Sequence, residues 1–182
     1  MKKKKTGSIF NATNSQKVLD FLASNPGKEY LSSEIQKATF ISRAGAYFAL
    51  KELSKEGLVS KQKKGKFLLY SIIYNDSAIK QFKVLQNVLI LRPLVSKLKP
   101  SSKKIVLYGS ASRGENDPSS DIDLFILSKE PDETKKIISS VKTKKKMQTV
   151  IKTPAELADF KKDEKVYYSE VERGVTLWEE TE

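Results

Sequence analysis

Two aspartates separated by one residue, Asp121 and Asp123, have the type and spacing of a metal-binding pair. They bracket the start of an apolar run, residues 122–127, whose length and β-branched content predict a strand. Side chains alternate along a strand, so both carboxylates should project from one face. Adjacent carboxylates repel each other unless a cation lies between them, and Mg²⁺ is typically held by one or two carboxylates with substrate phosphates. We therefore expect Mg²⁺, or Mn²⁺, at this pair.

Gly109 and Ser110 follow a second predicted strand, residues 104–108, and suit the phosphate side of such a site. Glycine lets the backbone approach a ligand closely, and the free amides of a turn that opens a short helix favour an anion. Ser110 adds a hydroxyl donor. The residues between the two strands are rich in Gly, Ser, Asn, Asp and Pro, which predicts turns. The Gly109–Ser110 turn and the aspartate pair, joined in a strand–turn–strand segment, together predict a nucleotide site.

This motif of Gly-Ser, ten residues and Asp-x-Asp, with Arg-Gly inside it, resembles the signature of the minimal nucleotidyltransferases of the DNA polymerase beta superfamily. The matching residues are Gly109, Ser110, Arg113, Gly114, Ser120, Asp121 and Asp123. Family members transfer a nucleoside monophosphate from an NTP such as ATP. The resemblance implies nucleotide binding by Gly109, Ser110, Arg113 and Gly114, and catalytic, metal-holding roles for Asp121 and Asp123. Ser112 stands where the family often has Ala before Arg-Gly.

The resemblance also implies a third carboxylate on a neighbouring strand, where it completes the metal site and helps to deprotonate the acceptor hydroxyl. The strand expected there, residues 147–152, contains no acidic residue. Gln148 is polar but cannot act as a base at neutral pH, and Glu156 is expected on the following helix. General base catalysis contributes about 10²- to 10⁴-fold. The sequence therefore leaves two interpretations open, slow catalysis or nucleotide binding alone.

Composition narrows the chemistry further. The chain of 182 residues contains no Cys and no His, which excludes disulfides, thiolate and imidazole metal ligands, and imidazole bases. No run of about 18 apolar residues predicts a membrane span. The lysines at residues 2–5 are not followed by an apolar segment, so we predict no secretory signal and a cytoplasmic location.

The net charge of +12 is concentrated near the amino terminus. Residues 1–75 hold 14 basic and 5 acidic side chains, whereas residues 76–182 hold 20 and 17. This asymmetry indicates a polyanionic partner for the first segment, and nucleic acid fits better than a membrane because no strongly amphipathic basic helix is apparent. The lysine arm at residues 2–5 is interpreted as a solubilising tail, with non-specific phosphate contact as the alternative.

Residues 15–72 have the pattern of three helices and a hairpin. Helices are expected from Ser15 to the Asn25-Pro26-Gly27 stop, from Ser32 to about Ala38, and from the cap Ser42 to Gly57. The third helix has a core stripe of Ala46, Ala49, Leu50 and Leu53. Strands at residues 58–62 and 67–72 should flank a turn of Lys63, Lys64, Gly65 and Lys66. This order resembles a winged helix-turn-helix domain.

The resemblance implies double-stranded DNA as a partner, with the third helix in the major groove. The residues expected to face bases or phosphates are Arg43, Tyr47 and Lys51, and those expected to touch the backbone from the wing are Lys63, Lys64 and Lys66. Two alternatives stay open. Winged helices also bind proteins, and a lysine-rich hairpin is often a solvated edge.

A long helix, about residues 77–98 with Ser77 as its cap, should link the two parts and pack under the sheet. Its apolar content also allows contact with a second copy in a homodimer. Further helices are expected at residues 131–141, from Pro154, and from about Glu164 to Gly174, with a closing strand at residues 175–178. Strands that alternate with helices indicate a small α/β sheet.

We therefore predict an α/β (α+β) protein with a winged helix-turn-helix domain at residues 1–75 and a minimal nucleotidyltransferase domain with a mixed sheet at residues 76–182. The first would bind DNA, and the second would bind NTP and Mg²⁺. If active, it would transfer a nucleoside monophosphate to a hydroxyl on a protein, such as a partner toxin, or on a small molecule. The alternative is a transcriptional regulator or antitoxin with a degenerate nucleotidyltransferase site.

Overall fold

The computed structural model describes residues 12–141 and 145–181, which form two compact units. The first runs to Ile79 and the second begins at Lys80, four residues beyond the domain limit expected from the sequence. The lysine arm at residues 2–5 lies outside the described residues. The structure confirms the mixed α/β fold class.

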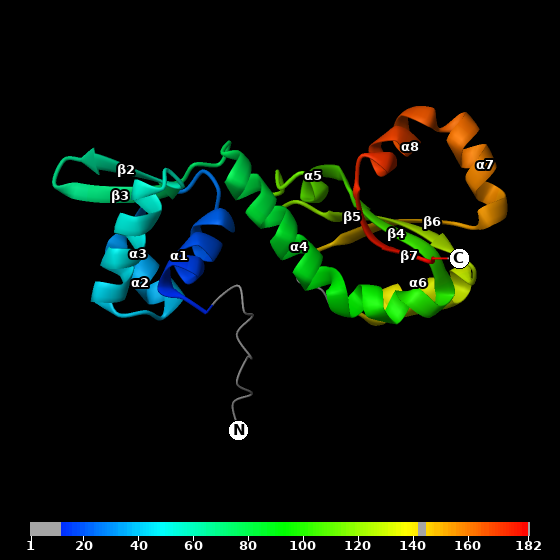
Figure 1. The fold of residues 1–182 in the computed structure, drawn as a ribbon, viewed down its shortest axis with the longest axis horizontal. Coiled ribbons are helices and arrows are strands. Elements are labelled where there is room, and N and C mark those ends of the chain that lie inside the picture. The colour runs from blue at the N-terminus through cyan, green and yellow to red at the C-terminus, as the bar shows by residue number, and fades with distance from the viewer. Residues whose placement is uncertain (1–11, 142–144, 182) are drawn as a thin grey trace, which may run out of the picture. The chain divides into compact units, whose positions relative to one another are not determined.

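The first unit has the topology of a winged helix-turn-helix domain. Its elements in chain order are α1 (Asn14–Ala23), β1 (Tyr30–Leu31), α2 (Ser32–Thr39), α3 (Arg43–Lys55), β2 (Val59–Lys64) and β3 (Phe67–Ile72). The three strands form an antiparallel sheet in the order β1-β3-β2. The β2–β3 hairpin extends beyond the helices as the wing (Figure 1).

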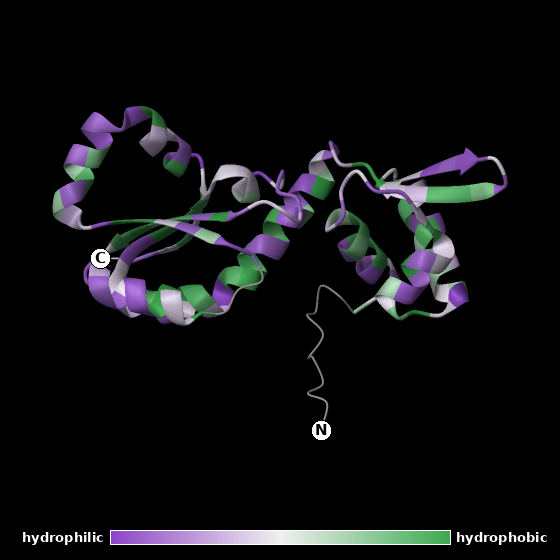
Figure 2. Ribbon diagram, turned by 180° about the vertical axis from the view of Figure 1, so that it is seen from behind, coloured by the Kyte–Doolittle hydropathy of each residue, from purple (hydrophilic) through white to green (hydrophobic). Residues whose placement is uncertain are grey.

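The core of this unit comes from the predicted helix stripes. Val18 and Leu22 of α1, Ile35 of α2, and Ala46, Ala49, Leu50 and Leu53 of α3 are all buried. Ser42 caps α3 as predicted, since its hydroxyl accepts a hydrogen bond from the Gly45 amide at 3.0 Å. The two strands of the wing differ in character: β2 is hydrophilic and β3 is hydrophobic (Figure 2).

Three local predictions for this unit are corrected. Lys63 and Lys64 belong to β2 and not to the turn, because each pairs with a residue of β3. Ser32 is the first residue of α2, and Leu31 occupies the cap position. The short strand β1 was not predicted, since two residues are too few to show a periodicity.

The second unit is built on a four-stranded mixed sheet. Its elements are α4 (Ser77–Leu98, shared with the first unit), the 3₁₀ turn η2 (Lys99–Ser101), β4 (Ser102–Tyr108), α5 (Gly109–Ser112), β5 (Ile122–Ser128), α6 (Pro131–Ser140), β6 (Met147–Lys152), α7 (Pro154–Asp163), α8 (Lys165–Glu172) and β7 (Val175–Glu179). The strand order is β6-β5-β4-β7. β5 and β6 are parallel, and the other pairs are antiparallel.

Helices cover both faces of this sheet (Figure 1). On one face, Leu91, Leu94 and Leu98 of α4 belong to the same buried cluster as Leu124 and Ile126 of β5, with α6 packed beside them. On the other face, Phe125 of β5 packs with Phe160 of α7 and Val171 of α8. The alternation along β5 therefore separates two cores, as the period of a strand requires.

The predicted cap of α4 is also corrected. Ser77 is the first helical residue, and the preceding residue, Asp76, provides the cap. Its carboxylate accepts hydrogen bonds from the amides of Ala78 at 2.8 Å and Ile79 at 3.2 Å.

Within the described ranges, none of the helices has the length and apolar character needed to cross a bilayer.

Replacing Asp76 by Ala is expected to lower the free energy of unfolding by about 1 kcal/mol, because two amides at the start of α4 lose their acceptor. Ser77→Ala is the matched control and should change stability little, because its side chain makes no capping hydrogen bond in the structure. Urea denaturation of both variants measures the difference. Equal losses would show that Asp76 is not the cap.

Candidate functional site

The candidate nucleotide site forms where β4 ends beside the start of β5. Tyr108 pairs with Asp123 in the antiparallel register, and Gly109 follows directly. A Cβ atom built on Gly109 would lie 2.4 Å from Oδ2 of Asp123, and Gly109 has a φ of +68°. Glycine is therefore required on two grounds, the conformation of the turn and the space taken by the carboxylate.

The carboxylate of Asp121 lies near enough to Asp123 for its charge to act on that group. Partial burial and the negative charge of Asp121 raise the pKa of Asp123 above its usual value. Two neighbouring side chains contact the Asp121 carboxylate. The Gln148 amide donates a hydrogen bond to its Oδ2 at 2.7 Å, and the Lys146 ammonium lies 3.6 Å from the same oxygen.

Gln148 occupies the place where the family resemblance implies a third carboxylate. β6 runs parallel to β5, and Gln148 is in register with Asp123. Glu156 lies on α7, where its carboxylate accepts hydrogen bonds from Thr153. Across residues 12–141 and 145–181, no group of three or more acidic side chains is arranged to hold a metal ion.

The carboxylate pair nevertheless fits a divalent cation of the Mg²⁺ type. Both donors are hard oxygen atoms, and the pKa of Asp123 is raised first by burial and then by repulsion from Asp121, which a cation would relieve. Two carboxylates leave several coordination positions open. Mg²⁺ commonly fills such positions with water and substrate phosphates.

Ser110 and Arg113 occupy different environments on the phosphate side. Ser110 is the second residue of the short α5 segment, after Gly109, and no described residue forms a hydrogen bond with its hydroxyl. Arg113 is ion-paired, with its guanidinium 2.9 Å from Glu115 and 3.2 Å from Glu170 of α8. To contact a nucleotide, Arg113 would have to exchange one of these carboxylates for a phosphate.

The loop from Arg113 to Ser120 is held together by Asp117. Its carboxylate accepts hydrogen bonds from the amides and hydroxyls of Ser119 and Ser120, which lower the pKa of Asp117 to about 2. The Lys145 ammonium donates to the Asp117 carbonyl at 2.7 Å. Ser120, a residue of the motif, thus shapes the loop that leads into Asp121.

Two buried polar residues of α4 hold the same loop from below the sheet. Lys83, 4% exposed, donates to the carbonyl of Asn116 at 2.5 Å. Asn87, 7% exposed, donates to the carbonyl of Ala111 at 2.8 Å and to the side chain of Asn116 at 3.0 Å. Gly114 packs so closely that a Cβ there would lie 2.1 Å from the Lys80 carbonyl. Gly114 is therefore a packing residue here.

Sequence analysis did not identify Lys83 and Asn87. The signal was present, because they lie four residues apart and continue to Leu91 along one helix face. A polar pair on a core-facing stripe indicates a buried hydrogen-bond network. The sequence analysis considered only the apolar content of this helix.

The six predicted DNA-contact residues all lie exposed on the first unit. Arg43, Tyr47 and Lys51 line one face of α3 at spacings of four. Lys63, Lys64 and Lys66 lie on the wing, but the Lys64 ammonium is 2.7 Å from a carboxylate oxygen of Glu29. That ion pair reduces the charge that Lys64 offers to a phosphate.

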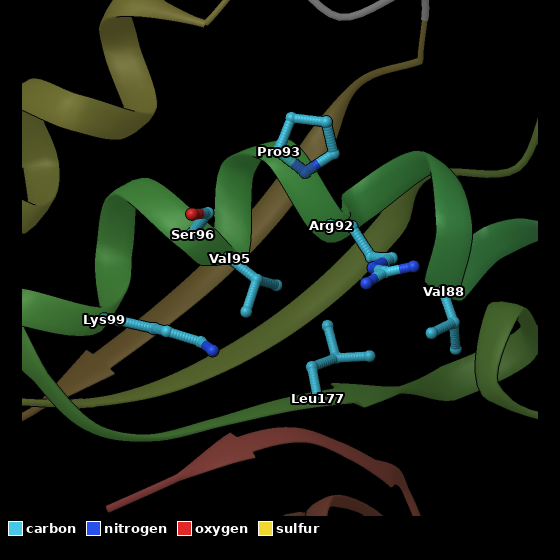
Figure 3. Close-up of a pocket in the computed structure, with 7 residues that line it drawn as sticks. All are labelled: Val88, Arg92, Pro93, Val95, Ser96, Lys99 and Leu177. Carbon is cyan, nitrogen blue, oxygen red and sulfur yellow. The ribbon is translucent and has the colours of Figure 1, made fainter.

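A separate cavity of about 500 Å³ lies in the second unit between α4 and β7. Arg92, Val95 and Leu177 point toward it (Figure 3), and none of the predicted nucleotide-site residues lines it. The aspartate pair and this cavity are therefore distinct features.

Residues 89–172 match the family described as nucleotidyltransferase domain, a segment that includes Gly109, Ser110, Asp121, Asp123 and Gln148. The matched segment is a little under half of the chain, and the strand, turn and strand observed here lie within it. No curated protein matches the chain.

Three solved structures are similar to parts of the chain. The homodimeric winged helix-turn-helix DNA-binding domain of a possible ArsR-family regulator from Mycobacterium bovis is 25% identical, over 44% of this chain and 70% of its own, with a TM-score of 0.37. A predicted DNA-binding transcriptional regulator from E. coli is 23% identical, over 42% and 79%, with a TM-score of 0.35. A hypothetical protein from Pyrobaculum spherical virus is 19% identical, over 70% and 74%, with a TM-score of 0.29. The winged-helix assignment rests on the topology of the first unit itself.

Replacing Asp123 by Asn removes a carboxyl group whose pKa is raised in the folded state. Ionisation of such a group destabilises the fold, so its cost is absent at low pH and appears as pH rises through the unfolded-state pKa of about 3.9. Asp123→Asn is therefore expected to raise Tm at pH 7 without metal, and to lose that advantage near pH 4. Asp132→Asn, at an exposed position on α6, is the control. A Tm at pH 7 equal to or below that of the unmodified protein would contradict this account.

Asn87→Ala is expected to lower the free energy of unfolding by about 1–3 kcal/mol, because the buried Ala111 carbonyl loses a hydrogen-bond donor. Ile90→Ala, at an exposed position of the same helix, should change it much less. Guanidinium denaturation measures both. Similar losses for the two variants would show that the loop does not depend on Asn87.

Proposed function

We propose that the nucleotidyltransferase domain binds a nucleoside triphosphate with Mg²⁺ or Mn²⁺, and that the winged helix binds double-stranded DNA. The observation that supports the nucleotide site best is the contact between Gly109 and the Asp123 carboxylate. It brings the phosphate-binding turn and the aspartate pair to a single place. A metal held there would lie beside the phosphates that complete its coordination.

Each residue has a distinct task in this proposal. The Gly109–Ser110 turn holds the triphosphate through backbone amides and the free Ser110 hydroxyl. Asp121 and Asp123 hold the metal. Arg113 is a second phosphate ligand that first releases Glu115 or Glu170. Gly114 lets the loop pack against α4.

An active domain transfers a nucleoside monophosphate to an acceptor hydroxyl on a protein or a small molecule, and pyrophosphate leaves. Bound Mg²⁺ supplies neutralisation of the charge that develops on the phosphates. The turn at Gly109 and Ser110 holds the leaving pyrophosphate. Gln148 orients the Asp121 carboxylate through its hydrogen bond, but its amide cannot accept a proton from the acceptor.

A second candidate is a DNA-binding regulator whose nucleotidyltransferase domain binds nucleotide without turnover. The hydrogen bond from Gln148 to Asp121 favours it, because an amide occupies the position of a third carboxylate and satisfies one of the metal-binding oxygens. Both candidates bind a nucleotide. They differ only in whether the nucleoside monophosphate is then transferred from it to an acceptor.

Nucleotide binding is tested by titration calorimetry with ATP and the other NTPs, with and without Mg²⁺ or Mn²⁺. We expect metal-dependent binding that weakens at least about tenfold, or about 1.4 kcal/mol, in Asp121→Ala with Asp123→Ala. Asp132→Asn is the matched acidic control on the surface. Unchanged binding in the double variant would contradict the assignment of the site.

Transfer is scored in the same preparations with α-labelled NTP and cell lysate. Label on a protein or small molecule that disappears in the double variant supports the enzyme. Metal-dependent binding without any labelled product supports the regulator.

A further inference from the structure

A small cleft in the first unit has features beyond those that groove contacts to DNA require. It has a volume of about 200 Å³ and lies between α3 and the β2–β3 wing. Its lining residues are Tyr47, Leu50, Lys51, Ser54, Lys61 and Tyr70. All of them belong to residues 12–79, so the cleft is complete within the winged helix.

Two rows of side chains form the walls. Tyr47, Lys51 and Ser54 are spaced four and three residues apart, which places them on one face of α3. Lys61 of β2 and Tyr70 of β3 are directly paired in the antiparallel register, so they present one adjoining patch of the wing. Both rows are fixed by regular elements, and the cleft is therefore preformed.

The cleft contains polar atoms that the protein leaves unsatisfied. The Ser54 hydroxyl oxygen is buried and has no hydrogen-bond partner among the described residues. Tyr70 is only 9% exposed, and no described residue forms a hydrogen bond with its hydroxyl. Burial, and then the neighbouring Tyr47, raise the pKa of Tyr70 above its usual value. Buried polar groups normally have partners, so the buried Ser54 hydroxyl indicates a polar ligand. The Tyr70 hydroxyl is not itself a buried atom without a partner, but it adds a second hydrogen-bonding group to the cleft.

The charge of the cleft selects an anion. Neither Lys51 nor Lys61 is ion-paired within the described part of the chain, in contrast to Lys64, which pairs with Glu29. Two ammonium groups thus border one small space without a counter-charge. A phosphate is the anion that a DNA-binding surface meets most often.

The cleft also opens beside exposed aromatic rings. Tyr47 is 58% exposed and Phe48 is 64% exposed, with ring centroids 5.4 Å apart in an edge-to-face arrangement. Aromatic faces next to lysines are the combination that binds unstacked bases, and each stacked base contributes enough to be measured by substitution. In a paired duplex these base faces are covered by their neighbours.

We propose that the cleft binds one unstacked nucleotide of a nucleic acid, with its base on the Tyr47 ring and its phosphate between Lys51 and Lys61. This inference rests on the proposed nucleic-acid binding by the winged helix, and it specifies which state of the nucleic acid is preferred. The cleft is smaller than the roughly 300–1,000 Å³ typical of pockets for whole small ligands. One residue of a longer strand therefore fits its size better than a free nucleotide.

The experiment uses the full chain and three oligonucleotides with one 2-aminopurine at the same position. One is single-stranded, one is fully paired, and one carries the 2-aminopurine as an unpaired bulge in a duplex. Affinity is measured by fluorescence anisotropy at fixed salt, and the environment of the base by 2-aminopurine emission. We expect the bulged and single-stranded forms to bind about tenfold tighter than the paired form, with quenched emission in the complex.

Three variants test the role of the cleft. Tyr47→Ala is expected to weaken binding of the bulged form by about 5- to 150-fold, the effect of losing one stacked base, and to remove the quenching. Tyr47→Phe keeps the aromatic ring, so it should keep both the affinity for the bulged form and the quenching. Lys63→Ala, on the wing outside the cleft, should weaken all three forms to a similar extent and leave the quenching intact. Thermal unfolding of each variant establishes that it is folded.

The outcomes separate this inference from the broader proposal. Equal affinity for all three oligonucleotides without a change in emission overturns the nucleotide cleft but leaves DNA binding standing. No binding to any of them overturns both. Competition by free nucleoside monophosphate at the concentration of the oligonucleotide overturns the choice of a nucleic-acid strand as the occupant.

Discussion

The contact between the Asp123 carboxylate and the Cα of Gly109 is the constraint on which the nucleotide site depends. It follows from the antiparallel register of β4 and β5, which sets Asp123 opposite Tyr108 and so beside the next residue. Any side chain at Gly109 would collide with the carboxylate. Partial burial and then the repulsion from Asp121 raise the pKa of Asp123. A cation between the two carboxylates would relieve that repulsion.

The loop between the two strands is ordered both by contacts from a distant segment of the chain and by hydrogen bonds within its own turn. Lys83 and Asn87 of α4 reach its carbonyl groups from the core, and Asp117 gathers the amides of its own turn. Buried donors are expensive to leave unpaired, so loop and helix stabilise each other. The geometry around Asp121 is thus an extension of the core. The arginine of the motif, by contrast, is held by two carboxylates at the surface.

The two units differ in net charge and in the kind of surface they present. The first is strongly basic and carries exposed aromatic and lysine side chains on α3 and the wing. The second is nearly balanced in charge, and it brings the Asp121 and Asp123 carboxylates together beside the ends of β4 and β5. A nucleic-acid surface needs long-range positive potential, whereas a metal and phosphate site needs a few groups placed closely.

The sequence by itself determined the elements and the motif. Most helices and strands were predicted within a few residues, because apolar periodicity and turn residues are local properties. Strand alternation led us to expect Asp121 and Asp123 on one strand face, but Asp121 lies one residue before β5 begins. Only the tertiary structure decided which polar groups meet: Gln148 on Asp121, Arg113 on Glu170, and Asn87 on the loop. The physical reason is that a hydrogen bond depends on ångström-scale geometry between segments that only the folded chain brings together.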